Sequence, residues 1–235
     1  MAKLTLLQRL ERDGEIYADR TQVSPGPLRD LLADIRACRL CLEAPLQGPL
    51  PHAPRPVLRV SATARLFISG QAPGLRVHKS GVPFTDPSGD RLRDWMGIDH
   101  ATFYDTAQVA VVPMGFCFPG YDAKGSDLPP RRECRAAWHD RLFAALPQAE
   151  TILAIGTYAQ DYHFARLGIP RPKGQSVTET VRNWRRGFEM TPHLIALPHP
   201  SWRNTGWLKQ NPWFEKEVLP ILRAEVARLT SPPPV

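Results

Sequence analysis

The stretch of sequence that most constrains the fold is residues 66–89, where a short apolar run ends in a loop rich in glycine and proline. The run Leu66 to Ile68 is followed by the tight segment Gly70 to Gly74, and a second tight segment, Gly81 to Phe84, leads to Asp86 and Pro87. Open α/β sheets build binding sites from such strand-and-loop units, at the carboxyl ends of their strands. Long loops in compact domains are usually functional, so we expect a binding site here.

Four apolar runs separated by helix-like patterns predict an α/β fold. The alternation of strands and helices favours a parallel sheet with helices packed on it. We therefore predict a three-layer α/β/α sandwich with a central four-stranded parallel sheet. The predicted strands are Arg65 to Ser69, Thr106 to Val112, Thr151 to Gly156 and His193 to Leu197.

The sequence also indicates where several helices begin. Asp86 followed by Pro87 is typical of an N-cap and a first helical residue, and Ser176 with Glu179 forms a capping box. Thr157 is the expected cap of the helix after the third strand. Further helices are predicted at Leu28 to Ala37, after Pro129 and Pro130, at Thr180 to Arg186, and after Asn211 and Pro212.

Length and composition indicate one main domain with short flanking segments. A chain of 235 residues with a hydrophobic fraction of 43% is the expected size for one α/β domain with a full core. We predict an N-terminal helical extension over residues 1–26, the main domain over 27–230, and a frayed tail over 231–235. No run of 18 apolar residues occurs, and the first apolar run breaks too early for a signal peptide, so we expect a soluble intracellular protein.

The charge of the chain favours a polyanionic partner. Lys and Arg number 30 against 23 Asp and Glu, which gives a formal charge of +7 and a pI of about 9.5. Nucleic acid is the simplest partner of this kind. The GxGxxG and GxxxxGK[ST] signatures are absent from the sequence, which disfavours a nucleotide-binding α/β protein with a zinc site.

Four cysteines form a pattern typical of a metal or redox site in a chain that is not exported. Cys38 and Cys41 are spaced as CxxC, and Cys117 and Cys134 follow much later in the chain. On ligand count alone, four thiolates suit zinc and an iron–sulfur cluster equally well. A loose set of buried free cysteines fits the spacing almost as well.

A second strand-and-loop unit near the C-terminus gives a family resemblance. The run His193 to Ala196 is followed by a His-Pro-Ser loop that contains His199 and Ser201. An early Gly-x-x-Pro-Gly loop and a late His-Pro-Ser loop, each after a strand, resemble the uracil-DNA glycosylase superfamily. The subgroup that the chain most resembles, over roughly residues 36–225, is the iron–sulfur glycosylases called family 4. The matching positions in the first loop region are Gly70, Ala72, Pro73, Gly74, Gly81, Pro83, Phe84, Ser88 and Gly89.

This resemblance implies the fold, partner and cofactor of the chain. It implies the same three-layer sandwich with the active site at the carboxyl edge, in a cytoplasmic, nucleoid-associated monomer that acts on DNA containing a damaged base. It also implies a structural [4Fe-4S] cluster, with zinc as the alternative. The implied metal ligands are Cys38, Cys41, Cys117 and Cys134.

The resemblance also implies roles in breaking an N-glycosidic bond. The enzyme must extrude the base, stabilise the departing base anion and supply water to the sugar carbon. Phe84 would stack on the flipped base, and His199 would donate a hydrogen bond to a carbonyl oxygen of that base. The expected site residues are Gln71, Asp86 and His199 for catalysis, Gln71, Ala72, Phe84, Met114 and His199 for base binding, and Ser201, Trp202, Arg203 and Lys79 for DNA binding.

Three positions depart from the family pattern. Family 4 has an acidic residue where this chain has Gln71, and the best-known uracil glycosylases have a water-activating aspartate where this chain has Ala72. The family 4 asparagine that reads the uracil edge is Pro113 here. Because glutamine cannot be a general base, Asp86 is our candidate for water activation, and base reading is expected to pass to backbone groups around Met114.

Taken together, the sequence predicts a monofunctional DNA glycosylase that removes uracil or another deaminated base. The alternative is a catalytically silent member of the same superfamily that binds damaged or single-stranded DNA. Both hypotheses predict affinity for DNA, and only the first predicts abasic sites as the product.

Overall fold

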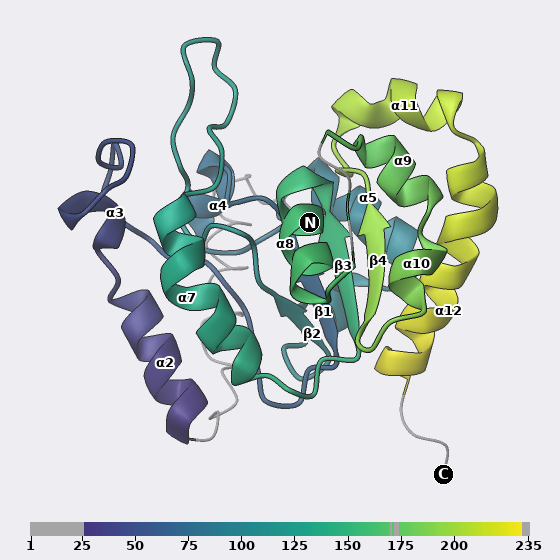
Figure 1. Cartoon of the computed structure of the whole chain (residues 1–235), viewed down its shortest axis with the longest axis horizontal. Coiled ribbons are helices and arrows are strands. Elements are labelled where there is room, and N and C mark those ends of the chain that lie inside the picture. Colours follow the sequence, from purple (N-terminus) through teal and green to yellow (C-terminus); the bar gives the residue numbers. More distant parts are fainter. Residues whose placement is uncertain (1–25, 170, 172–173, 232–235) are drawn as a thin grey trace, which may run out of the picture.

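Four parallel strands form the centre of the computed structural model, which describes residues 26–169, 171 and 174–231 (Figure 1). The strand order is β2-β1-β3-β4, and every neighbouring pair is parallel. Nearly all strand residues are buried, as expected for a parallel sheet with both faces covered. The predicted α/β fold is confirmed. The strands are β1 (Leu66–Ser69), β2 (Val109–Val111), β3 (Thr151–Ile155) and β4 (His193–Leu197).

Helices cover both faces of this sheet. In Figure 1, α7 (Arg132–Ala144) and α8 (Gly156–Arg166) lie in front of the strands, and α5 (Pro87–Met96) lies behind them. The last helix, α12 (Leu219–Thr230), packs against α5. The remaining segments are α2 (Gly26–Arg36), α3 (Leu40–Glu43), α4 (Leu75–Ser80), α6 (His100–Tyr104), α9 (Val177–Arg182), α10 (Arg185–Phe188), α11 (Thr205–Gln210), the 3₁₀ turn η1 (Trp202–Asn204) and the π-helical turn η2 (Phe214–Val218).

Two of the three predicted helix caps are confirmed. The Asp86 side chain accepts a hydrogen bond from the Gly89 amide at the start of α5, and Ser176 and Glu179 form the predicted capping box of α9. The prediction for Thr157 is wrong, because α8 already begins at Gly156. A φ of +77° at this glycine turns the chain directly from β3 into the helix.

The second strand is shorter than predicted. Of the predicted range Thr106 to Val112, only Val109–Val111 is strand. Asp105 forms a turn before it, since its carboxylate accepts from the Ala107 amide at 2.9 Å and its carbonyl accepts from the Gln108 amide at 3.0 Å. These local bonds compete with the sheet ladder for the backbone of residues 106–108.

The predicted flanking segments fall mostly outside the described residues. Residues 1–25 of the predicted N-terminal extension and residues 232–235 of the predicted tail are not described, so these predictions stay untested. Across residues 26–169, 171 and 174–231, the structure contains no helix with the length and apolar character needed to cross a bilayer.

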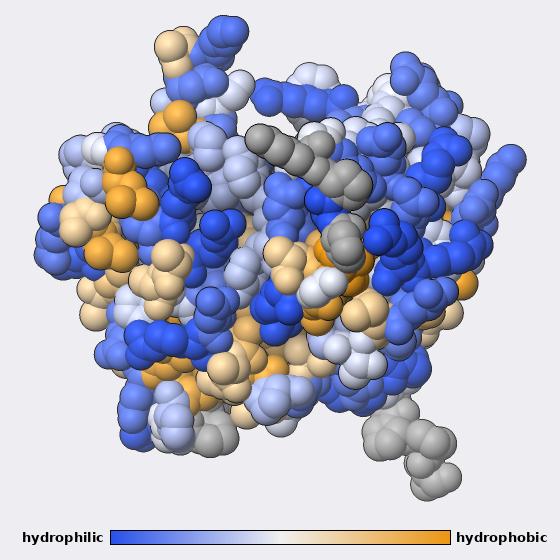
Figure 2. Space-filling view, in the orientation of Figure 1, coloured by the Kyte–Doolittle hydropathy of each residue, from blue (hydrophilic) through white to orange (hydrophobic). Residues whose placement is uncertain are grey.

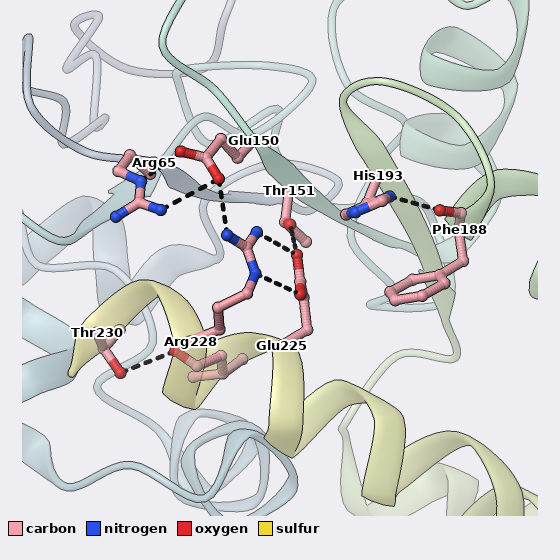
Figure 3. A network of polar contacts seen from close by, with 9 residues as sticks. Arg65, Glu150, Thr151, Phe188, His193, Glu225, Arg228 and Thr230 are labelled. Carbon is pink, nitrogen blue, oxygen red and sulfur yellow. Dashed lines mark hydrogen bonds and ion pairs between the residues drawn. The ribbon is translucent and has the colours of Figure 1, made fainter. Parts of the chain in front are cut away.

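A network of charged side chains closes the amino-terminal edge of the sheet (Figure 3). Arg65, which precedes β1, pairs with Glu150, and Arg228 of α12 bonds both Glu150 and Glu225. The Thr151 hydroxyl also donates to Glu225. Arg65 first and then Arg228 lower the pKa of Glu150 to about 2. The two arginines and two glutamates of this network balance each other in charge.

Candidate active site

The strand order creates a switch point between β1 and β3, which is where open α/β sheets bind their ligands. A cavity of about 130 Å³ lies at this carboxyl edge. Since ligand pockets for drug-sized molecules span about 300–1,000 Å³, this cavity suits a single ring rather than a whole nucleotide. Among the residues that line it are the predicted site residues Gln71, Ala72, Phe84, Asp86 and His199.

Phe84 is held in an unusual backbone conformation beside the cavity. Its φ of +56° lies in the left-handed region, which costs a non-glycine residue about 1–2 kcal/mol. The Phe84 carbonyl accepts from the Tyr104 hydroxyl at 3.0 Å and from Arg93 Nη1 at 3.3 Å. Its ring meets Phe103 edge-on, with 5.9 Å between the ring centroids. These contacts hold a half-buried aromatic ring in the wall of the cavity.

Helix α5 connects the two loops that form the site. Its N-cap residue Asp86 lines the cavity, and the cap also fixes the end of the first loop. On the next turn, Arg91 donates to the Ser201 carbonyl at 2.9 Å and to the Thr205 hydroxyl at 3.1 Å. One helix therefore sets the position of the first loop relative to the His-Pro-Ser loop.

His199 is exposed at the mouth of the cavity, in a defined orientation. The Ser201 amide donates to His199 Nδ1 at 3.2 Å, and Asn204 Nδ2 donates to the His199 carbonyl at 2.7 Å. With Nδ1 accepting, the neutral ring carries its proton on Nε2, which can donate to a ligand. Desolvation by the surrounding protein lowers the pKa of His199, against the opposing effect of Asp86 and Asp127.

Asp127 is a site residue that the sequence analysis missed. It lines the same cavity as Asp86 and His199, and a methyl placed on Gly74 would lie 3.6 Å from its Oδ2. Desolvation raises the pKa of Asp127, and the nearby Asp86 raises it further. Arg203 and His199 lower this pKa. Within the part of the chain that the structure describes, no donor lies at hydrogen-bonding distance from this carboxylate. Its loop follows β2 and so begins at the carboxyl edge of the sheet. That position was the one indication in the sequence that Asp127 could reach the site.

The structure does not bring Met114 to the cavity. Its side chain is buried in the core, and its amide donates to the Gly70 carbonyl at 2.9 Å. The next amide, that of Gly115, donates to the Gln71 carbonyl at 3.0 Å. These backbone donors hold the first loop in place and are not free to read a base. Pro113 lines the cavity instead.

The four predicted DNA-binding residues are not all in one place. Ser201, Trp202 and Arg203 line a groove of about 610 Å³ that opens beside the cavity. Lys79 lies at the end of α4, exposed, and lines neither the cavity nor the groove. Its carbonyl accepts from Arg55 Nη1 at 2.7 Å, so this segment is tied to the loop before β1.

The four cysteines come together from three segments of the chain. Cys38 and Cys41 lie at α3, Cys117 follows β2, and Cys134 lies in the first turn of α7, next to α3 in Figure 1. Burial raises the pKa of Cys41 to about 11 and that of Cys117 to about 12, and it raises the pKa of Cys134 further. The other cysteines add to the rise for each of these three thiols.

Three N–H groups point at sulfur atoms in this cluster of cysteines. Trp138 Nε1 lies 3.3 Å from Cys38 Sγ, the Phe116 amide lies 3.4 Å from Cys134 Sγ, and the Arg55 amide bonds Cys117. Such donors favour thiolates. Within the described ranges, however, no three His, Cys, Asp or Glu side chains converge in the manner of ligands around one metal ion. The four thiols thus lie in one region of the structure, but they are not arranged as the ligands of a single metal ion.

A comparison with known protein families agrees with this geometry. The model of the uracil DNA glycosylase superfamily matches residues 59–223, a range that contains all four strands and both loops of the site. The match extends over most of the chain, from before β1 into α12. The chain belongs to the uracil DNA glycosylase superfamily.

Proposed function

We propose that the chain is a monofunctional DNA glycosylase that hydrolyses the N-glycosidic bond of uracil or another deaminated base. The observation that carries this proposal is the cavity at the switch point, where Phe84, His199 and two carboxylates meet. Membership of the superfamily supports the same class of reaction.

In this proposal, Phe84 and His199 act on the departing base. The Phe84 ring offers a face on which an extruded base stacks, an interaction worth about 1–3 kcal/mol per base. The Nε2 proton of His199 donates to a carbonyl oxygen of the base, where negative charge grows as the bond breaks. A neutral histidine suits this role, because Nδ1 accepts from the Ser201 amide and the ring proton is therefore on Nε2.

We assign water activation to Asp127 rather than to Asp86. The Asp86 Oδ1 already accepts from the Ser88 hydroxyl at 2.6 Å and from the Gly89 amide at 3.4 Å, as part of the helix cap. Asp127 lines the cavity, and desolvation raises the pKa of its carboxylate above the ordinary value, as suits a general base. As the water oxygen bonds to the sugar C1′, the C1′–N bond breaks, its electron pair leaves with the base, and the water proton passes to Asp127.

The base specificity follows from the side chains that line the cavity. Pro113 offers no side-chain hydrogen bond, and the Met114 amide is bonded to Gly70. Gln71 is the amide side chain that lines the cavity, and it carries both a donor and an acceptor. We therefore propose that Gln71 reads the edge of the base and that several deaminated bases are accepted.

A cleavage assay tests this function. Labelled oligonucleotides that carry uracil, hypoxanthine or xanthine, single-stranded and paired, are incubated with the protein and treated with alkali to reveal abasic sites. We expect cleavage of at least one substrate and its loss in His199→Ala and Phe84→Ala. A folded protein that leaves all of them intact would contradict the proposal.

A second candidate function is binding of damaged DNA without cleavage. The observation that favours it is the segment directly after β1, where Gln71 and Ala72 line the cavity at positions that carry an acidic residue in active relatives. This candidate predicts tight binding to damaged oligonucleotides and no abasic product. The same assay, run beside a binding measurement, separates the two functions.

We also propose that Cys38, Cys41, Cys117 and Cys134 hold a structural [4Fe-4S] cluster, as in family 4. The chemistry of the donor set supports this proposal, because the four thiols interact electrostatically and three N–H groups face their sulfur atoms. The cluster would join α3 to α7 and take no part in base excision. Iron and sulfide analysis of protein purified without oxygen tests this. We expect four iron atoms per chain, whereas zinc alone would favour the alternative metal.

A further inference from the structure

A groove beside the cavity is framed by two exposed aromatic residues from distant parts of the chain. The groove has a volume of about 610 Å³ and shares Gln71, Asp86, Asp127 and His199 with the cavity. One wall comes from the segment between β2 and α7, and the other comes from the start of η1. A strand of nucleic acid with one base in the cavity would have its neighbouring nucleotides in this groove.

The first wall is a hairpin that rises above the carboxyl edge, seen at the top of Figure 1 in teal. Tyr121 and Asp127 pair in an antiparallel bridge, and the Leu128 amide donates to the Gly120 carbonyl at 2.9 Å. At the tip, the Asp122 carboxylate accepts from the amides of Lys124 and Ser126, both at 2.8 Å. These bonds make the hairpin a defined structure.

The hairpin presents the ring of Tyr121 beside the groove. The residue is 50% exposed, and its ring meets that of Phe118 edge-on, with 5.0 Å between the centroids. In Figure 2 the hairpin projects from the top of the molecule and carries both hydrophilic and hydrophobic residues. The exposed half of the Tyr121 side chain is available for a stacking contact.

The second wall presents Trp202, which is 71% exposed. The Arg203 guanidinium lies 5.9 Å from the centroid of its ring, and Arg91 bonds the Ser201 carbonyl before this tryptophan and the Thr205 hydroxyl after it. The exposed tryptophan is therefore carried on a well-anchored turn. Together with Tyr121, it gives the groove two aromatic platforms.

The groove offers little charge for phosphate contacts. The charged residues that line it are Asp86, Asp127 and Arg203, so acidic groups outnumber basic ones. Phosphate contacts in the groove therefore add little affinity for a single strand or for a duplex. Stacking on aromatic rings, by contrast, needs free base faces, which unpaired strands offer and paired strands do not.

We propose that this groove binds single-stranded DNA, with Tyr121 and Trp202 stacking on the unpaired bases that flank the base in the cavity. The inference rests on the proposed function for the position of the excised base. It assigns a DNA contact to Tyr121, and it makes an unpaired strand the preferred substrate.

Binding to DNA without a damaged base tests the groove apart from the chemistry. Fluorescence anisotropy is measured with a labelled oligonucleotide of ordinary bases, single-stranded and as a duplex, at matched salt. We expect tighter binding to the single strand. Tyr121→Ala and Trp202→Ala should each weaken single-strand binding by about 5- to 150-fold, the loss of one stacked base.

Two further variants control for the loss of an exposed ring. Tyr121→Phe keeps the stacking face and should bind like the wild type. Tyr158→Ala removes a tyrosine that is 39% exposed but lines a different hollow, and should also bind like the wild type. Equal or tighter binding to the duplex, or a Tyr121→Ala variant that binds like Tyr158→Ala, would overturn the inference. An absence of cleavage with these binding results intact would count against the glycosylase function alone.

Discussion

Replacing Gly89 by alanine tests whether α5 holds Phe84 in place. A methyl on Gly89 would lie 2.6 Å from the carbonyl carbon of Phe84, 2.9 Å from its Cβ, and closer still to its carbonyl oxygen. The obstacle is backbone, so the loop or the first turn of α5 must move. The same carbonyl accepts bonds from Tyr104 and Arg93, which such a shift would weaken.

The expected effect has a stability part and an activity part. Overpacking costs about 1–3 kcal/mol, and weakening a hydrogen bond adds about 1 kcal/mol. At about 2–4 °C per kcal/mol for a domain of this size, the Tm should fall by roughly 5–15 °C. Loss of the stacking face should lower kcat/KM by about 5- to 150-fold, similar to the loss in Phe84→Ala.

Thermal unfolding and single-turnover cleavage measure the two parts. Gly206→Ala is the matched control, because a methyl on this helical glycine meets nothing within 4 Å. It should leave the Tm unchanged or raise it slightly, since alanine is favoured over glycine in helices by about 0.5–1 kcal/mol. If Gly89→Ala keeps both the wild-type Tm and the wild-type kcat/KM, our account of how Phe84 is positioned is wrong.

Three other predictions follow from the geometry. Asp127→Asn should lower kcat by about 10²- to 10⁴-fold, the usual contribution of a general base, with the Tm unchanged; a larger kcat loss in Asp86→Asn would assign the role to Asp86 instead. Burial lowers the pKa of His139 from 6.5 to about 4. Between these pH values the histidine of the unfolded protein is protonated and that of the folded protein is not. The free energy of unfolding should therefore fall by up to about 3 kcal/mol as the pH drops from 6.5 to 4. The urea midpoint of His139→Gln should fall less steeply with decreasing pH than that of the wild type. An identical pH dependence of the two midpoints would contradict this role of His139. Gly187→Ala should destabilise by about 1–3 kcal/mol, because the methyl meets the Leu194 backbone, yet leave kcat/KM unchanged, since the clash is remote from the cavity.

Much of the fold could be predicted from the sequence because the signals are local. All four strands follow from short apolar runs between helical patterns, and the start of α5 follows from Asp86 and Pro87. The boundaries that were wrong depend on single residues. The turn at Asp105 shortens β2, and the positive φ of Gly156 starts α8 without a cap at Thr157.

The site was predictable only where a loop directly follows a strand. Phe84, Asp86 and His199 belong to the two loops with a recognisable pattern, and the structure brings them to one cavity. The prediction that backbone groups around Met114 read the base could not anticipate their partners. The amides of Met114 and Gly115 bond the carbonyls of Gly70 and Gln71, which lie in a loop far away in the sequence.

The residues that neighbour Asp127 in the sequence do not indicate that its side chain lines the cavity. It lies in a polar loop with several turn-forming residues, and only the bridge to Tyr121 and the bond between Leu128 and Gly120 return it to the edge of the sheet. Its relation to Asp86 and His199 is a tertiary one, since three separate loops contribute one side chain each. Charge and spacing along the chain carry no such information.

Helix α5 explains why two motifs more than a hundred residues apart in the chain act as one site. Its cap supplies Asp86, its first turn packs Gly89 under the Phe84 carbonyl, and Arg91 bonds the carbonyl of Ser201 two residues after His199. The ring that we propose to stack on the base and the proposed hydrogen-bond donor are therefore positioned by the same rigid element. Catalysis by preorganised groups requires that their relative positions be fixed, because a misplacement of a group by about 1 Å can cost 10²-fold in rate. The glycine and the arginine of α5 thus matter to the chemistry although neither is assigned a contact with the base.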